Sequence, residues 1–182
     1  MSTPTILTAS GRYFDFTAPE PFEFKIEDIA HALSRLCRFG GHTKKFYSVA
    51  QHAVHVSYIV PESLEMEGLL HDAAEAFVGD MVRPLKALMP EFKAIEDRIY
   101  AAIAEQYRIP SQMSSEVKRA DLVLLATEQR DLMPPHDDNW ACLSGIRPLS
   151  QKIEPMTPET AYTWFIGRYN AIGLNRVRRD LV

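Results

Sequence analysis

The chain has 182 residues, of which 46% are hydrophobic, and this size and composition predict one domain with an ample core. Its net charge of −4 argues against binding to nucleic-acid backbones. Its two cysteines, Cys37 and Cys142, lie in no CxxC pair and no zinc-type spacing, which excludes a structural zinc and a disulfide framework. No apolar run approaches the ~20 residues that span a bilayer, and the first residues lack a secretory signal, so we expect a soluble cytoplasmic protein that does not bind membranes.

The first part of the chain predicts a hairpin followed by helices. Residues 5–16 contain two β-prone segments around a Ser-Gly turn, which indicates a small β-hairpin. Apolar residues at helical spacing then predict a helix from Ile26 that stops at the pair Gly40-Gly41. The pattern S-x-x-Q at residues 48–51 is a capping box, with a hydroxyl at the N-cap and an amide three residues later, and it starts the next helix.

The rest of the chain predicts further helices and one long loop. Apolar periodicity indicates helices over 64–78, 91–107 and 115–130. The loop over 131–156 is longer than most connectors, so it is either functional or an oligomer contact. A last helix begins at Thr157, which supplies a hydroxyl cap before a proline. The fold class is all-α with a small N-terminal β-hairpin, in one domain that spans 1–182 and comprises the hairpin and connector (1–25), a helical core (26–130) and the loop with the last helix (131–182).

The segment HDAAE, residues 71–75, places ionisable side chains within an apolar helix. Charges are rarely buried without a partner, and a cation is the simplest partner for this set. At helical spacing His71, Asp72 and Glu75 address one side of the helix, and imidazole with carboxylate suits zinc, manganese, iron or cobalt better than calcium. The alternative is a solvated helix face with one hydrogen-bonded histidine.

Other segments place further candidate ligands among apolar residues. His52 lies in the sequence VAQHAVHV, and Asp121 faces the aliphatic stripe of ADLVLL. With His71 and Asp72 they make four ligands, which leaves coordination positions open for water and substrate, as in catalytic sites. Asp80 follows the predicted end of the third helix.

The candidate ligands and their order along the chain resemble those of the HD-domain phosphohydrolases. The block HDAAEAFVGDMVRPLK, residues 71–86, is similar to the same region of bacterial 5′-deoxynucleotidases and of small phage-type HD nucleotide hydrolases, and the likeness covers roughly residues 26–130. The resemblance implies an HD-domain helical bundle with one divalent metal ion, where zinc, cobalt, manganese and magnesium stay open. The implied metal ligands are His52, His71, Asp72 and Asp121.

The resemblance also implies roles for residues around the metal. Glu75 and Asp80 occupy the positions at which the deoxynucleotidases handle protons and order water, and they are the implied catalytic residues. Arg38 matches the arginine that those enzymes use against phosphate, and an aromatic residue follows it there as here. The implied substrate-binding residues are Arg38, Phe39, Gly41, His42, Lys86 and Lys118.

The sequence GGHT at 40–43 is more similar to the phage-type members, which include dATP triphosphohydrolases, and Lys86 and Lys118 match basic positions that contact the polyphosphate there. We therefore expect a triphosphohydrolase of deoxynucleoside triphosphates, with dATP as the candidate substrate. Metal-activated water would attack the α-phosphorus and release nucleoside and triphosphate. The alternatives are a 5′-deoxynucleotidase that acts on monophosphates and a non-catalytic nucleotide-binding HD protein. The resemblance also implies a homo-oligomer.

Two residues near the candidate ligands have more than one interpretation. Glu128 lies two helical turns after Asp121 on the same face, where it either orients a ligand or forms a salt bridge to a neighbouring helix. His55 is three residues from His52, and it is either a packed or solvated histidine or a group that supports the metal ligands.

Overall fold

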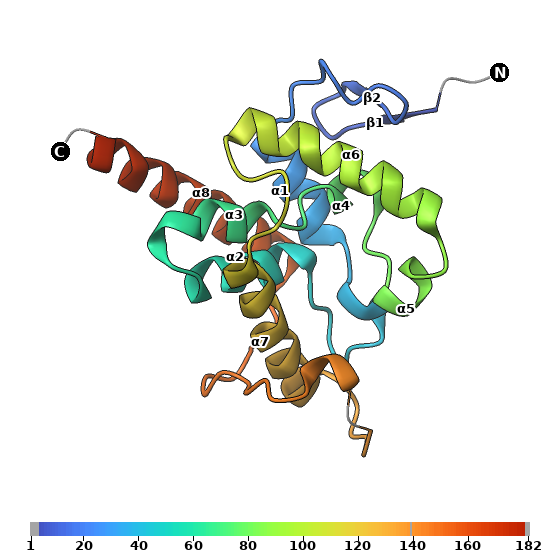
Figure 1. The fold of residues 1–182 in the computed structure, drawn as a ribbon, viewed down its shortest axis with the longest axis vertical. Coiled ribbons are helices and arrows are strands. Elements are labelled where there is room, and N and C mark those ends of the chain that lie inside the picture. The colour runs from blue at the N-terminus through green and yellow to red at the C-terminus, as the bar shows by residue number, and fades with distance from the viewer. Residues whose placement is uncertain (1–3, 139, 181–182) are drawn as a thin grey trace.

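The fold is known from a computed structural model, which describes residues 4–138 and 140–180, with side chains up to residue 176. Helices form most of it, and a two-stranded sheet lies at one end (Figure 1), so the predicted all-α class with a small hairpin is confirmed. The elements in chain order are β1 (Thr5–Leu7), β2 (Tyr13–Asp15), α1 (Ile26–Arg35), η1 (Arg38–Gly41), α2 (Val49–Ile59), η2 (Glu62–Leu64), α3 (Glu65–Leu70), α4 (Glu75–Val78), α5 (Arg83–Lys86), α6 (Pro90–Tyr107), α7 (Ser115–Leu132), η3 (Ala141–Leu143) and α8 (Pro158–Asp180).

The central helix is α2, which packs against α1, α3, α7 and α8. Ser48 caps it as predicted, because its hydroxyl accepts a hydrogen bond from the Gln51 amide at 3.1 Å. The other half of the predicted capping box is not formed. The Gln51 side chain instead donates to Glu154 O at 2.8 Å and accepts from Met156 N at 2.9 Å. This buried amide therefore fixes the segment before α8 against the central helix.

The predicted hairpin is confirmed, and two contacts attach it to the helices. β1 and β2 pair antiparallel, with Ile6 opposite Phe14. The Phe14 ring packs on Phe77 of α4 with centroids 4.6 Å apart. Ser10 donates from its amide and its hydroxyl to the buried carboxylate of Asp28 on α1, both at 2.7 Å.

The first helix ends earlier than predicted, at Arg35 instead of residues 40–41. The next residues are extended because the segments 36–38 and 47–49 pair through backbone hydrogen bonds of 3.0 and 3.1 Å. The chain then makes the single turn η1, in which Phe39 has a φ of 57°, in the left-handed region that favours glycine. A long-range pairing therefore ends the helix and places η1 beside the start of α2.

The predicted helix over 64–78 is also wrong as one continuous element. It consists of α3 and α4, separated by a turn at residues 71–74 whose backbone hydrogen bonds of 2.9 and 3.0 Å join residues three apart. The physical reason is a side chain, since His71 Nδ1 lies 2.8 Å from Gly68 O. In a continuous helix that carbonyl would accept from the Asp72 amide.

The later helices agree with the prediction. The Ser114 hydroxyl accepts from Val117 N at 3.3 Å at the start of α7, and the Thr157 hydroxyl accepts from Thr160 N at 3.3 Å at the start of α8. In the described part of the chain, no helix has both the length and the apolar character needed to cross a bilayer.

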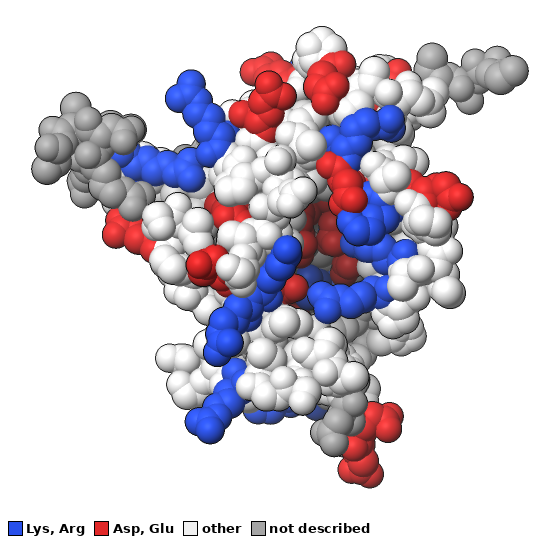
Figure 2. Space-filling view, in the orientation of Figure 1, with Lys and Arg blue, Asp and Glu red and all other residues white. Residues whose placement is uncertain are grey.

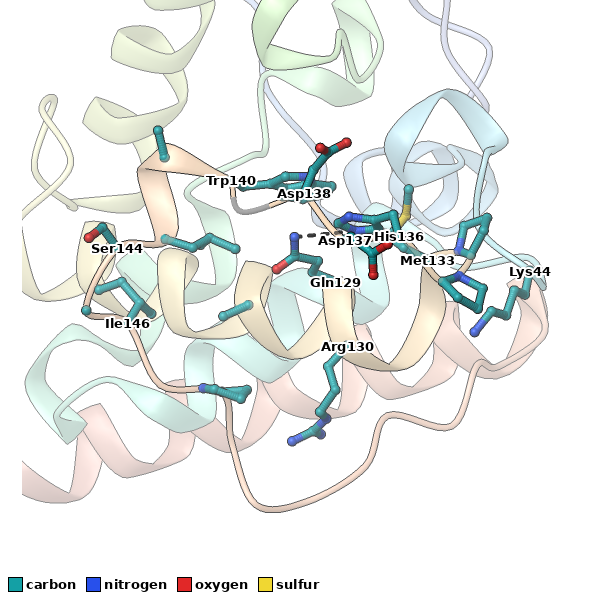
Figure 3. A pocket seen from close by; sticks show the side chains of 17 residues that line it. Lys44, Gln129, Arg130, Met133, His136, Asp137, Asp138, Trp140, Ser144 and Ile146 are labelled. Atoms are coloured by element: carbon teal, nitrogen blue, oxygen red, sulfur yellow. Dashed lines mark hydrogen bonds between the residues drawn. The ribbon is translucent and has the colours of Figure 1, made fainter.

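The long loop between α7 and α8 has two parts. Its second part is held on α7, because Leu149 N donates to the Thr127 hydroxyl and Ile153 N to the Asp131 carboxylate, each at 2.9 Å. Its first part encloses a cavity of about 970 Å³ with α7, and Trp140 forms one wall of it (Figure 3). A functional or oligomeric role for this loop stays a prediction.

Candidate metal centre

Three elements that are distant in sequence contribute the four predicted ligands, and three of these, His52, His71 and Asp72, offer ligand atoms that all lie within 4.8 Å of one another. His52 comes from α2, His71 and Asp72 from the turn at 71–74, and Asp121 from α7. His52 Nε2 lies 3.2 Å from His71 Nε2 and 3.2 Å from Asp121 Oδ1. Asp72 Oδ2 lies 3.2 Å from His71 Nε2. We call these four residues the ligand cluster.

The hydrogen bonds on the far side of each imidazole decide which ring nitrogen faces the cluster. His71 Nδ1 must carry its proton, because its partner at 2.8 Å, the Gly68 carbonyl, can only accept. His52 Nδ1 likewise donates to the buried Glu128 carboxylate at 2.6 Å. When each ring is neutral its Nε2 carries a lone pair, and the two Nε2 atoms lie 3.2 Å apart beside two carboxylates. A cluster made of acceptors alone attracts a cation and could hold a metal ion.

The charged groups around the cluster have a net negative charge, which favours a cation. Arg38 Nη1 lies 3.5 Å from Asp72 Oδ2, and Nη2 lies 3.3 Å from Glu128 Oε2. With Asp121, which lies 3.6 Å from the more exposed Arg83, the site has three carboxylates against two guanidiniums, so its charge is negative when both imidazoles are neutral. Glu128 therefore makes both of the contacts predicted for it. It accepts the hydrogen bond that orients His52, and it forms a salt bridge with Arg38. The residues present fit a divalent metal ion.

The pKa values of these groups follow the same electrostatics. Burial lowers the pKa of His52 and Arg38 lowers it further, but the carboxylates around the ring, Glu128 above all, outweigh both and raise it to about 9. Burial opposes ionisation of Asp72, yet its interactions with His71, His52 and Arg38 hold its pKa well below the usual range. The cluster therefore attracts positive charge, whether a proton or a metal ion.

A cleft of about 730 Å³ opens onto the cluster, and His71, Asp72 and Asp121 all line it. Figure 2 shows this hollow, with acidic side chains in its depth and basic side chains around it. We call it the metal cleft. Its basic lining residues are Arg83, Lys86, Lys93 and Lys118.

The two predicted catalytic acids differ in position. Glu75 lines the metal cleft, and its Oε2 is buried without a hydrogen-bond partner in the described structure. Burial, together with the charges of Asp72 and Asp80, raises the pKa of Glu75 well above its usual value. Asp80 follows α4 beside the cleft but does not line it, and burial raises its pKa as well.

The predicted substrate-binding residues fall into two groups. Lys86 and Lys118 line the metal cleft, and Arg38 lies behind it against Asp72. The Phe39 ring points instead to Trp140, with centroids 6.1 Å apart. The predicted substrate-binding residues that do not line the cleft are Arg38, Phe39, Gly41 and His42.

One face of α6 contributes residues that we did not predict. Lys93, Glu96, Asp97 and Tyr100 all line the metal cleft. Their spacing of three and four residues is the helical repeat, so the sequence contained a signal for this face. It was missed because the family resemblance assigns no role to the helix.

His55 lies outside the ligand cluster, and its ring packs on Trp164 with centroids 5.0 Å apart. Burial lowers its pKa to about 4, and the nearby charge of His52 adds to this effect.

We expect His55 to make the protein acid-sensitive. From its unfolded pKa of about 6.5 down to about 4, the unfolded chain binds more protons at this site than the folded chain, so stability falls as the pH falls. Relative to His55→Phe, the wild type should lose about 2 kcal/mol between pH 7 and 4.5. Urea unfolding of both proteins at several pH values measures this difference, and a difference that does not change with pH would contradict it.

Comparison with known proteins identifies two relatives, and their names state no activity. The chain is 45% identical over 166 residues to "Uncharacterized protein YfdR" of Escherichia coli, in an alignment that covers 91% of this chain and 93% of YfdR. It is 36% identical over 121 residues to an uncharacterized protein of Rhodobacter capsulatus, which covers 61% of this chain and 62% of that protein. No protein-family model matches the chain.

Proposed function

This chain belongs to the family of the Escherichia coli protein YfdR, and from its ligand cluster we propose that it is a metal-dependent phosphohydrolase of the HD type that acts on deoxynucleotides. The preferred substrate is a deoxynucleoside triphosphate, with dATP as the first candidate, cleaved to nucleoside and triphosphate. One observation carries the proposal: two imidazole lone pairs and two carboxylates meet at the base of a cleft that basic side chains surround.

The open cleft supports a catalytic metal over a structural one. A structural zinc is enclosed by four protein ligands, whereas a catalytic ion keeps positions for water and substrate. Asp72 and Asp121 both remain partly exposed to the cleft, at 18% and 17% of their side-chain surface. A divalent cation held by the ligand cluster would lower the pKa of a bound water and polarise a phosphoryl oxygen.

The chain's own residues supply the other requirements of phosphate-ester hydrolysis. Burial raises the pKa of Glu75, which favours its acid form, and this acid would give a proton to a leaving oxygen in the cleft. Lys86 Nζ lies 3.7 Å from Glu75 Oε1, so the positive charge of Lys86 lies beside this acid. Lys118 makes no ion pair with any described residue and can bind a phosphate oxygen.

A 5′-deoxynucleotidase is the second candidate, and one observation favours it. Three of the four cations that line the cleft are already paired: Lys86 lies 2.7 Å from Glu96, Lys93 lies 2.7 Å from Asp97, and Arg83 lies 3.6 Å from Asp121. A single phosphate needs fewer free cations than a triphosphate does.

A substrate panel tests the proposal and separates the two candidates. The protein is freed of metal, reloaded with Mn, Co, Mg or Zn, and incubated with deoxynucleoside triphosphates, ribonucleoside triphosphates and deoxynucleoside monophosphates. We expect metal-dependent release of nucleoside and inorganic triphosphate from a deoxynucleoside triphosphate. Orthophosphate from monophosphates alone would establish the second candidate, and no metal-stimulated release from any nucleotide would overturn both.

A further inference from the structure

Tyr100 has an unsatisfied hydroxyl group in the wall of the metal cleft. It lies on α6 and lines the cleft together with Glu75 and Asp72. Its Oη is buried and has no hydrogen-bond partner in the described structure. A buried hydroxyl without a partner costs stability, and a binding site is one of the few places where a folded protein keeps such a group.

The other polar side chains on this face of α6 are already paired. Lys93 Nζ binds both carboxylate oxygens of Asp97 at 2.7 Å. Glu96 accepts from Lys86 at 2.7 Å. Among the four residues on this face of α6, Tyr100 is therefore the one whose polar group has no partner in the described structure and could bind a ligand.

The surroundings of Tyr100 favour a neutral ligand group over a phosphate. Burial raises the pKa of Tyr100 well above its usual value, and the negative charges of Glu67 and Asp72 add to that shift. The hydroxyl therefore stays protonated and can donate, while the negative potential disfavours an anion at this point. The cleft is also lined by the uncharged side chains of Ser111, Gln112 and Met113.

The position of Tyr100 along α6 identifies which neutral group it would meet. It lies four residues after Glu96, which is about 6 Å along a helix axis, and Glu96 holds the phosphate-binding candidate Lys86. The sugar of a nucleotide lies between its 5′-phosphate and its base. A substrate with its phosphate at Lys86 and the ligand cluster would therefore place its sugar at Tyr100 and its base towards residues 111–113.

We propose that Tyr100 donates a hydrogen bond to the 3′-hydroxyl of the deoxyribose, and that Gln112 lies at the base end of the same subsite. The proposal rests on the proposed function, since it takes a deoxynucleotide as the ligand. Gln112 makes no hydrogen bond with another described residue, and its amide offers both a donor and an acceptor, as a base edge requires.

The test removes one partner of the hydrogen bond at a time. The metal-loaded protein is assayed with dATP and with 2′,3′-dideoxyadenosine triphosphate, which lacks the 3′-hydroxyl. The wild type should prefer dATP by about tenfold in kcat/KM, and Tyr100→Phe should reduce this preference to less than about twofold. Tyr107→Phe is the matched control, because that hydroxyl donates to Phe24 O at 2.7 Å outside the cleft; it should keep the full preference.

A wild type without preference, or a Tyr100→Phe variant that keeps it, would overturn the proposal. To separate this outcome from failure of the proposed function, calorimetry measures binding of the 5′-methylene phosphonate analogues of both nucleotides, which are not hydrolysed. Discrimination that Tyr100→Phe removes, in a protein that hydrolyses nothing, would support the sugar contact and refute the phosphohydrolase. Hydrolysis without discrimination would do the reverse.

Discussion

Replacement of Asp72 by alanine is expected to reduce deoxynucleotide hydrolysis by about 1,000-fold or more, because an active site that loses its metal loses both water activation and phosphoryl polarisation. Asp72 Oδ2 lies within 3.6 Å of three cationic or ligating groups, on Arg38, His52 and His71. Metal content measured by mass spectrometry should fall with activity.

The fold should survive this substitution. Arg38 keeps its second carboxylate partner, Glu128, at 3.3 Å, so the variant should retain the helical circular-dichroism spectrum of the wild type. Asp137→Ala, at an exposed position in the loop after α7, is the matched control and should leave activity and metal content unchanged. Wild-type turnover in Asp72→Ala would be incompatible with the ligand cluster.

The largest effect away from the metal itself is expected for Glu128→Gln. The glutamine oxygen can still accept from His52 Nδ1, so the ring keeps its orientation while the buried charge is removed. Second partners of metal-bound histidines change affinity by about 10- to 100-fold, and we expect metal affinity to fall within that range. The free energy of unfolding should also drop by about 3 kcal/mol, because Arg38 loses a buried partner.

Competition titrations with a metal indicator and urea unfolding of the metal-free protein measure the two effects separately. Glu116→Gln is the control, since Glu116 lies on the same helix at an exposed position. Unchanged metal affinity in Glu128→Gln would show that His52 does not need this carboxylate.

The elements that were predicted well have local signals. The hydroxyl caps at Ser48, Ser114 and Thr157 each satisfy a backbone amide at the start of a helix, and such caps can be recognised from neighbouring residues alone. The end of α1 was wrong because the segment 36–38 pairs with 47–49. The glycines that follow gave a plausible local stop, and only the long-range pairing overrides it.

The candidate site also combines features that the sequence predicts with features that depend on the three-dimensional structure. The order of the four ligands could be obtained from the sequence, and they converge in the structure. The interruption of the helix at 71–74 could not be obtained from the sequence, because it depends on the hydrogen bond from the His71 side chain to a helix carbonyl. The periodicity of apolar residues does not indicate such a bond. Tyr100 was missed for a different reason: as a partly apolar residue on a regular helix it resembles core, and only the three-dimensional cleft shows that its hydroxyl lacks a partner.

The two imidazoles are oriented by partners that lie at very different distances along the chain. The partner of His71 is three residues away, within its own turn, whereas the partner of His52 is 76 residues away on α7. During folding, the first ring can therefore adopt its final tautomer as soon as the turn forms, and the second must wait until α7 docks. Docking also delivers Asp121, so an incompletely folded chain has neither a fourth ligand nor a fixed second imidazole. The metal ion that we propose for the ligand cluster would therefore bind with high affinity only to the finished fold.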